Sequence, residues 1–313
     1  MISLLCYIYP LLICGYEPPE VTIGWSRIMG IRQEVNSNTK HDEKSMLNVF
    51  LGIPYAEPPL NSYRFRPPEP IKSVNYFGYY AGKFKPRCIS PDYYEKFLGS
   101  TFDDQQEDCL YLNIWSPSNL TDPKDLKPVL VYVHDPSIDV RSIDGAKLSH
   151  RDDMVVITFD YRTGLFGLIE GYDNQISDNA IFHDTKAVLK WVQENISHLG
   201  GDPTKVTLFA EGKESVRAGL QFSYAINEKL FARMVTRNGP KLASFDTDQS
   251  IQWQDVLDVA EKVGCDQKKN QLLLLYCLRN SDAKDLINGY LSINGSSTSL
   301  NLSTITYSHM LNH

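Results

Sequence analysis

Three short apolar runs constrain the fold of this chain more than any other feature. They are Val129–His134, Met154–Phe159 and Lys205–Ala210, and each lacks the alternation of a half-exposed strand. Such runs suit strands that are buried on both faces of a mostly parallel sheet. Between the last two runs, Asp184–Leu199 carries apolar residues at helical spacing on one face. This alternation of strand and helix predicts an α/β layered fold.

The flanking segments are less regular. Residues 46–90 are rich in Pro, Gly and Tyr, which predicts loops and short edge strands. Two later segments, Trp253–Val263 and Asn270–Leu278, are predicted to be helices. The tail Ser292–Ser303 is rich in Ser, Thr and Asn and is predicted to be a loop.

Size and charge exclude some classes of protein. The chain has 313 residues, of which 42% are hydrophobic and 22% charged, as in a folded globular protein of one large domain or two ordinary ones. The formal net charge is −7 and Lys and Arg do not cluster. A nucleic-acid partner is therefore not expected, because it would require a basic face.

The first 15 residues are apolar and too short to span a bilayer. We interpret them as a secretory signal peptide. There is no Lys or Arg before the apolar run, and Pro10 interrupts it. A truncated or misassigned start is therefore the alternative.

The cysteines and sequons also favour export. Two of the six cysteines fall in the leader, and the remaining four are spaced as two local pairs, which suggests Cys88 with Cys109 and Cys265 with Cys277. An even number of cysteines together with several Asn-x-Ser/Thr sequons favours an oxidising secretory route. The sequons lie at Asn119, Asn195, Asn294 and Asn301.

Six motifs follow one another within roughly residues 20–290: Phe50–Pro59, Arg64–Pro68, Glu107–Trp115, Asp160–Gly167, Trp191–Ile196 and Gly200–Pro203. In residues and order they resemble one family, the type-B carboxylesterases and cholinesterases, whose turn matching Asp160–Gly167 begins with Asn. The resemblance implies an α/β-hydrolase fold, with a mixed, mostly parallel central sheet and helices on both faces. It also supports the two local cysteine pairs, which correspond to the first two disulfide loops of the family.

Domains of this family are much longer than this chain. Their catalytic residues occur in the order serine, acid, histidine, so the acid and histidine would lie beyond residue 313. We therefore expect residues 16–313 to be the N-terminal part of such a domain, as a C-terminally truncated version of the fold. A fragmentary gene model, a splice form and a truncated paralogue all remain open.

The nucleophile of the family is absent from the matching position. The serine stands at a strand-to-helix elbow of the form Gly-x-Ser-x-Gly, where small flanking residues permit a sharp turn. Here the segment after the third apolar run is Ala210–Glu214, and Gly212 stands in place of the serine. Glycine has no side chain that could attack an ester.

Ser215 is the alternative nucleophile. Lys213 and Arg217 would then stand where the elbow needs glycines. The downstream motifs Leu230–Arg233 and Asn238–Gly239 fall at the family distances only if the glycine is the equivalent position. We therefore interpret Ser215 as an ordinary helix residue.

The oxyanion hole is disrupted independently. The family builds it from backbone N–H groups of a His-Gly-Gly-Gly-type loop, and the matching residues here are His134, Asp135, Pro136 and Ser137. Pro136 has no N–H to donate, and Asp135 would place a negative charge near the developing oxyanion. We interpret His134 itself as a structural residue.

These observations predict a non-enzyme. The seven histidines show no metal-binding spacing and no phosphate-binding loop is present, so no metal or cofactor is expected. Inactive members of the family, such as neuroligins, neurotactin, glutactin and gliotactin, act in adhesion or as receptors, and neuroligins also carry glycine at the nucleophile position. The resemblance implies an extracellular protein partner, a secreted or cell-surface location and a possible homodimer; no membrane anchor is visible in this chain. The alternatives are a decayed esterase duplicate, an active carboxylic ester hydrolase, and an aromatic-lined pocket that binds ligands without turnover.

Overall fold

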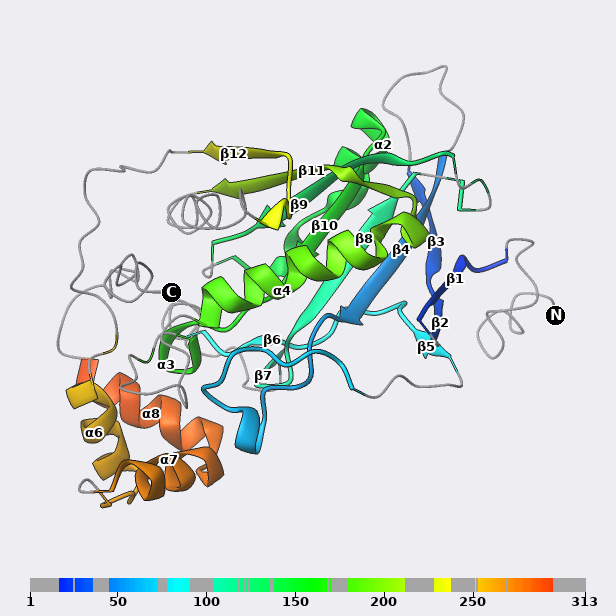
Figure 1. Ribbon diagram of the computed structural model, residues 1–313. Helices are drawn as coiled ribbons and strands as arrows, with labels where there is room; N and C mark the ends of the chain where they lie inside the picture. Colours follow the sequence, from blue (N-terminus) through cyan, green and yellow to red (C-terminus); the bar gives the residue numbers. More distant parts are fainter. Residues whose placement is uncertain are drawn as a thin grey trace.

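The computed structural model shows a central sheet with a long helix across it and a group of helices at one end (Figure 1). It describes residues 17–24, 26–35, 45–72, 78–90, 104–117, 119–120, 122, 124–135, 138–167, 169, 180–211, 228–237, 251, 253–267 and 270–294. The predicted leader lies outside these residues.

The central sheet has seven strands in the order β12-β11-β9-β10-β8-β4-β3. The pairs β12–β11, β11–β9 and β9–β10 are parallel, whereas β10–β8, β8–β4 and β4–β3 are antiparallel. The sheet is therefore mixed, as predicted, with the parallel half toward β12. The strands are β3 (Ile31–Val35), β4 (Ser45–Pro54), β8 (Tyr111–Ser116), β9 (Lys127–Val133), β10 (Val155–Phe159), β11 (Gly201–Glu211) and β12 (Arg233–Arg237).

The three apolar runs form the middle of this sheet. They become β9, β10 and β11, and all five residues of β10 are buried. Both faces of the sheet are covered, because two separate hydrophobic clusters form, one against each face. The strand predictions are confirmed. The expected burial on both faces is complete in β10, whereas in β9 and the second half of β11 buried residues alternate with half-buried ones.

The prediction for residues 46–90 is wrong for β4. This strand has ten residues and lies inside the sheet, between β3 and β8. Its Gly and Pro do not break it, because Gly52 takes a left-handed conformation (φ 73°) at a bulge where the register shifts. The Gly52 N–H donates to Asn113 Oδ1 at 2.9 Å, so β8 provides the partner that the bulge removes.

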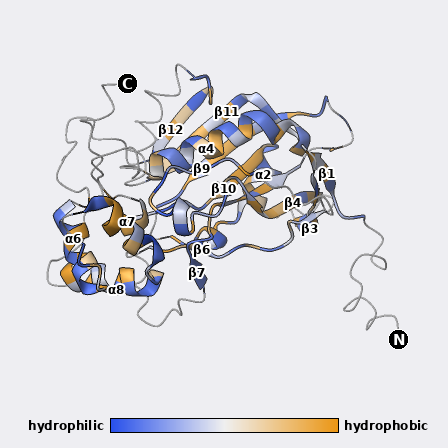
Figure 2. Ribbon diagram, turned by 60° about the horizontal axis from the view of Figure 1, so that its bottom comes forward, coloured by the Kyte–Doolittle hydropathy of each residue, from blue (hydrophilic) through white to orange (hydrophobic). Residues whose placement is uncertain are grey.

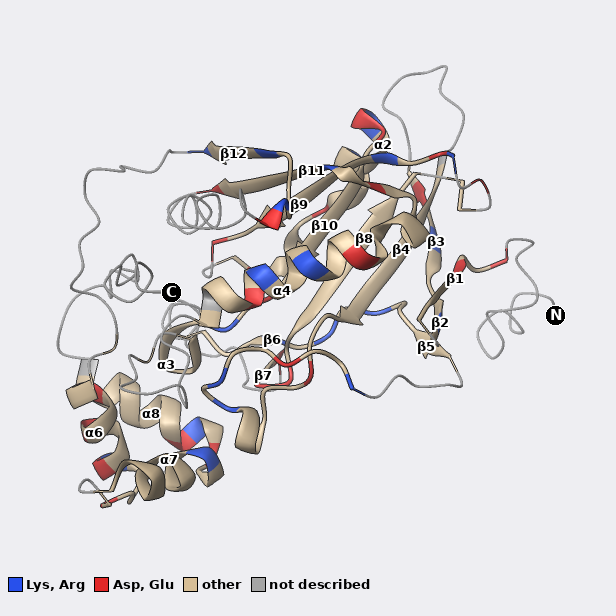
Figure 3. Ribbon diagram, in the orientation of Figure 1, with Lys and Arg blue, Asp and Glu red and all other residues tan. Residues whose placement is uncertain are grey.

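Helices cover both faces. Helix α4 (Ala180–Asn195) packs Val188 and Val192 against the larger cluster, and α2 (Gly145–Asp152) contributes Ala146 to the smaller one. Charged residues lie on α4 (Figure 3). The predicted helix 184–199 ends earlier than expected: residues 196–199 form a 3₁₀ helix, η5 (Ile196–Leu199), which Gly200 terminates at φ 81°.

Smaller elements complete the N-terminal two-thirds. A three-stranded sheet is formed by β1 (Glu20–Ile23), β2 (Ser26–Met29) and β5 (Tyr79–Tyr80), and a two-stranded one by β6 (Arg87–Cys88) and β7 (Gln105–Gln106). The short helices are η2 (Asn61–Tyr63), η4 (Val140–Ser142) and α3 (Gly164–Gly167).

Three helices gather beside the sheet at its lower left in Figure 1. They are α6 (Trp253–Lys262), α7 (Gln271–Asn280) and α8 (Ala283–Asn294). The first two confirm the predicted helices, and Asn270 caps α7 by accepting from the Leu273 N–H. Helix α8 was not predicted. It packs on α6, and the hydropathy colouring shows apolar residues on all three helices (Figure 2).

Both expected disulfides are present. Cys88 of β6 is bonded to Cys109, which precedes β8, and Cys265 after α6 is bonded to Cys277 of α7. Peptide mapping of the exported protein without reduction should recover these two pairs, and removing either bond should destabilise the fold by about 2–4 kcal/mol through loop entropy. Cross-paired peptides, or four free thiols, would contradict this.

Candidate functional site

The site is expected where the parallel strands end. In open α/β sheets, ligands bind outside the carboxyl ends of the strands. At this edge β9 is followed by His134 and Asp135, β10 by Asp160, and β11 and β12 end in Glu211 and Arg237. The sequence therefore brings three acids, one histidine and one arginine to this edge of the sheet.

Glu211 is engaged by its neighbouring strands. Its Oε1 lies 3.3 Å from Nη1 of Arg237 on β12, and its Oε2 accepts from the Tyr132 hydroxyl on β9 at 3.5 Å. The strand register places these three side chains at the same end of the sheet. The residue before the nucleophile position is thus held by an arginine and a tyrosine.

The remaining elbow residues and part of the oxyanion loop are not described. Gly212, Ser215, Pro136 and Ser137 lie outside the described residues, so their assigned roles stay predictions. The structure does describe the residues that flank them. Glu211 ends β11 directly before Gly212, and the Ile138 N–H donates to the Asp135 carbonyl at 2.9 Å across the loop.

His134 is buried and turned into the protein. Its Nδ1 lies 2.9 Å from the Asp135 carbonyl, and its Nε2 lies 3.6 Å from Asp160 Oδ1. The Tyr161 hydroxyl donates to the His134 carbonyl, and the two rings are in contact. The ring is thus held by packing and by a carboxylate, which agrees with a structural role.

Asp160 is the residue that sequence reasoning missed. Its Oδ2 accepts from the Cys88 N–H at 2.7 Å and its Oδ1 from the Tyr161 N–H at 3.2 Å, while its carbonyl accepts from the Tyr55 hydroxyl. The sequence could have drawn attention to Asp160, because the resembling motif has Asn at this position.

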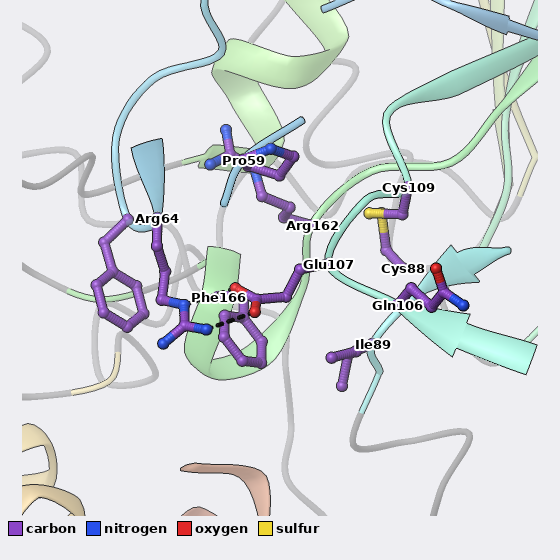
Figure 4. A pocket seen from close by; sticks show the side chains of 10 residues that line it. Pro59, Arg64, Cys88, Ile89, Gln106, Glu107, Cys109, Arg162 and Phe166 are labelled. Carbon is purple, nitrogen blue, oxygen red and sulfur yellow. Dashed lines mark hydrogen bonds and ion pairs between the residues drawn. A yellow bond between two sulfur atoms is a disulfide. The ribbon is translucent and has the colours of Figure 1, made fainter. Parts of the chain in front are cut away.

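Two buried ion pairs lie nearer the helical group. Arg64 bonds Glu107 through two nitrogens, and Arg162 bonds Asp184 in the same way. Figure 4 shows Arg64, Glu107 and Arg162 around a small cavity beside the Cys88–Cys109 disulfide. Its volume is about 10 Å³, room for about one water molecule, so no organic ligand fits there.

A larger cleft of about 880 Å³ lies between α4 and the sheet of β1, β2 and β5. Aliphatic residues and prolines form much of its lining, and three aromatic side chains contribute: Tyr55, Tyr79 and Trp191. Its rim carries Lys186 and Lys190, which pair with Glu228. The cleft is therefore lined by apolar residues together with charged and polar ones, among them Glu69, His183 and Glu194.

Within the described ranges no three His, Cys, Asp or Glu side chains are grouped as metal ligands. Nor does any helix in the described part have the length and apolar character needed to cross a membrane.

The sequons differ in their surroundings. Asn119 is exposed in a loop, whereas Asn195 is half-buried and its Nδ2 donates to the Trp191 carbonyl at 2.9 Å. Asn294 is the last residue of α8, and Asn301 lies outside the described residues. Of the two sequons whose side-chain surroundings are described, that of Asn119 would obstruct a glycan less than that of Asn195.

Comparison with solved structures defines the class of protein. The fold superimposes on a thermophilic pNB esterase with a TM-score of 0.68 and 26% identity, covering 88% of this chain and 54% of that one. The chain therefore has an α/β-hydrolase fold.

Comparison of sequences defines the family. Residues 17–313 match the model of the carboxylesterase family, so the chain belongs to that family. Mouse carboxylesterase 3B is 34% identical over 283 residues (86% of this chain, 47% of the relative). A medium-chain fatty acyl-CoA hydrolase precursor of Anas platyrhynchos is 31% identical over 284 residues (86% and 49%). An acetylcholinesterase-1 of Trittame loki is 32% identical over 236 residues (72% and 42%). The chain spans about half the length of these curated relatives.

Proposed function

We propose that this chain is a non-catalytic member of the carboxylesterase family that binds a protein partner outside the cell. One observation supports the proposal: Gly212 directly follows Glu211, the last described residue of β11, where the resembling motif has its nucleophilic serine. A hydrolase of this fold needs a hydroxyl at that position. Protein binding is suggested by the inactive members that the sequence resembles, because they act in adhesion or as receptors and neuroligins among them share this glycine.

The surroundings of the elbow support the loss of catalysis. Glu211 is held by Arg237 and Tyr132, and His134 is turned toward Asp160. Asp135 follows directly after His134, where the family has a glycine whose N–H faces the oxyanion. Of Glu211, His134 and Asp135, Asp135 is the one that departs from the family pattern, and its negative charge would oppose a developing oxyanion.

The names of the relatives favour another candidate. They are called carboxylesterases, an acyl-CoA hydrolase and an acetylcholinesterase, so carboxylic ester hydrolysis is the second candidate function. A decayed duplicate without function is the third. The proposal also includes export, with residues 1–15 as the leader and residues 16–313 as the N-terminal part of a secreted or cell-surface domain. Glycans at the sequons and a possible homodimer belong to it as well.

Restoring the nucleophile alone should not restore activity. We expect Gly212→Ser, placed in a version completed with the C-terminal half of an active family member, to hydrolyse p-nitrophenyl and thiocholine esters no faster than the same protein with Gly212. Pro136 would still withhold an oxyanion donor, and losing one such donor costs about 10²–10³ in rate. Lys213 and Glu214 would still occupy positions that the elbow reserves for small residues.

A second variant tests the reason. Changing Asp135, Pro136 and Ser137 to glycine together with Gly212→Ser should raise the rate above that of the single variant. Saturable turnover from the single change would show that the loop is not a destroyed oxyanion hole.

The binding half of the proposal needs its own test. Beads coated with the exported protein should bind cells saturably, and trypsin treatment of the cells should abolish the binding. If the beads do not bind cells and the protein does not hydrolyse esters, a decayed duplicate is favoured. Ester hydrolysis by the native protein would favour the esterase.

A further inference from the structure

The pair formed by His134 and Asp160 is unusual in its burial. The side chain of His134 is 1% exposed and that of Asp160 is 8% exposed, and the two lie 3.6 Å apart. This separation is within ion-pair range and slightly beyond a hydrogen bond. In the part of the chain that the structure describes, Nε2 of His134 has no hydrogen-bond partner, so Asp160 is the group that faces it.

The pair joins three separate elements. His134 follows β9, Asp160 follows β10, and Asp160 Oδ2 accepts from Cys88 of β6, which carries the disulfide to Cys109. The Tyr161 hydroxyl adds a second link to the His134 carbonyl. A change in the charge of His134 therefore alters the contacts that join these three elements.

We propose that His134 and Asp160 form a proton-dependent latch: the imidazolium of His134 ties the end of β9 to the Asp160 carboxylate, and the tie weakens when the ring loses its proton. An asparagine at position 160, as in the resembling motif, could not form this ion pair. The latch is thus a property of this chain's own residues, and it does not depend on whether the chain is a binding protein or an esterase.

The charged groups around the ring decide the direction of the effect. Burial lowers the pKa of His134, the carboxylate of Asp160 and the carbonyl of Asp135 raise it, and Arg87 of β6 lowers it, with a balance above the usual 6.5. Farther along the loop, Asp139 is neutralised by Arg141 at 2.7 Å. The acid facing the ring therefore outweighs both burial and the nearby guanidinium.

The sign of the pH dependence follows. A histidine whose pKa is higher in the folded state stabilises the fold fully below its unfolded pKa, and the stabilisation is lost as the pH rises through the folded pKa. The latch is therefore closed under mildly acidic conditions and opens toward alkaline pH.

The test compares urea unfolding of the native chain and of Asp160→Asn between pH 6 and pH 9. Asparagine retains an oxygen that can accept from Cys88 or Tyr161, so it removes the charge with little other change. Over this range the unfolding equilibrium constant of the native chain should rise more than that of the variant. The excess should be about tenfold for each unit by which the folded pKa of His134 exceeds its unfolded value. His198→Gln, at an exposed histidine, should follow the native profile.

A measurement on the native chain alone keeps the test decisive if the variant does not fold. The ¹³Cε1 signal of His134, assigned by its loss in His134→Gln or by its contact with the Tyr161 ring, should titrate above pH 6.5. Parallel stability profiles for the native chain and Asp160→Asn, or a His134 signal that titrates below 6.5, would overturn the latch.

Discussion

Replacing Asp184 by alanine should destabilise the protein by about 3–5 kcal/mol, because it leaves the guanidinium of Arg162 buried without its carboxylate. The two side chains are 0% and 4% exposed. Arg162 donates to Asp184 through Nη2 at 2.6 Å and Nε at 3.0 Å, and its Nη1 reaches the Arg66 carbonyl at 2.7 Å. The carboxylate on α4 therefore holds the turn after β10. The loss is measured as the change in urea midpoint at constant m-value.

The matched control removes both charges. Arg162→Met combined with Asp184→Leu fills the site with apolar side chains, and such replacements of buried pairs are often neutral or stabilising. We therefore expect the double variant to be more stable than Asp184→Ala. A loss below about 1 kcal/mol for the single variant would mean that water reaches Arg162 and that the pair contributes as little as a surface ion pair.

Arg64→Met is the second substitution for which we expect a large effect, a loss of about 3–5 kcal/mol in the free energy of unfolding. Arg64 donates to both Glu107 oxygens, and its Nη1 also donates to the carbonyls of Leu278 and Ser281 at 2.7 and 2.8 Å. These carbonyls lie at the end of α7, where helix C-termini leave acceptors unpaired. With methionine at this position, the Glu107 carboxylate and the carbonyls at the end of α7 would both lose the donor that Arg64 provides.

Hydrogen exchange should locate this loss. Amides of α7 and α8 should lose more protection in Arg64→Met than those of β9 and β10, because the bridge ends on α7 and its loss should also favour local opening there. Lys72→Met is the control, because the ion pair of Lys72 with Glu69 is 60% and 39% exposed and such surface pairs contribute little to stability. Equal effects of the two substitutions would refute the bridging role of Arg64.

The parallel half of the sheet could be predicted from the sequence because burial on both faces leaves a direct trace, a run without alternation. β4 left no such trace. Its Gly52 and Pro54 read locally as turn residues, and only the bulge against β8 shows how the strand continues through them. Helix α8 was missed for a related reason: its burial depends on α6, which contributes the opposite face.

The candidate site shows a similar division. Gly212 and residues 134–137 could be selected from the sequence because the resembling motifs mark those positions, and their roles stay predictions. The group that faces His134 could not be selected, because Asp160 follows the neighbouring strand β10 and approaches only through the sheet register. The link between Arg237 and Glu211 also depends on the pairing of β12 with β11. Motifs indicate which positions to compare with the family, whereas pairing between strands determines which side chains meet there.

The bridge from Arg64 to the end of α7 can form only late during synthesis of the chain. The residues that it joins, Arg64 and Leu278, are 214 positions apart. At a synthesis rate of about 5–20 residues per second, this separation corresponds to a wait of roughly 10–40 s before the arginine meets its carbonyls. During that time Glu107, which emerges much sooner, can neutralise the guanidinium on its own. The early ion pair would then hold the Arg64 side chain in place until the C-terminal end of α7 has been synthesised.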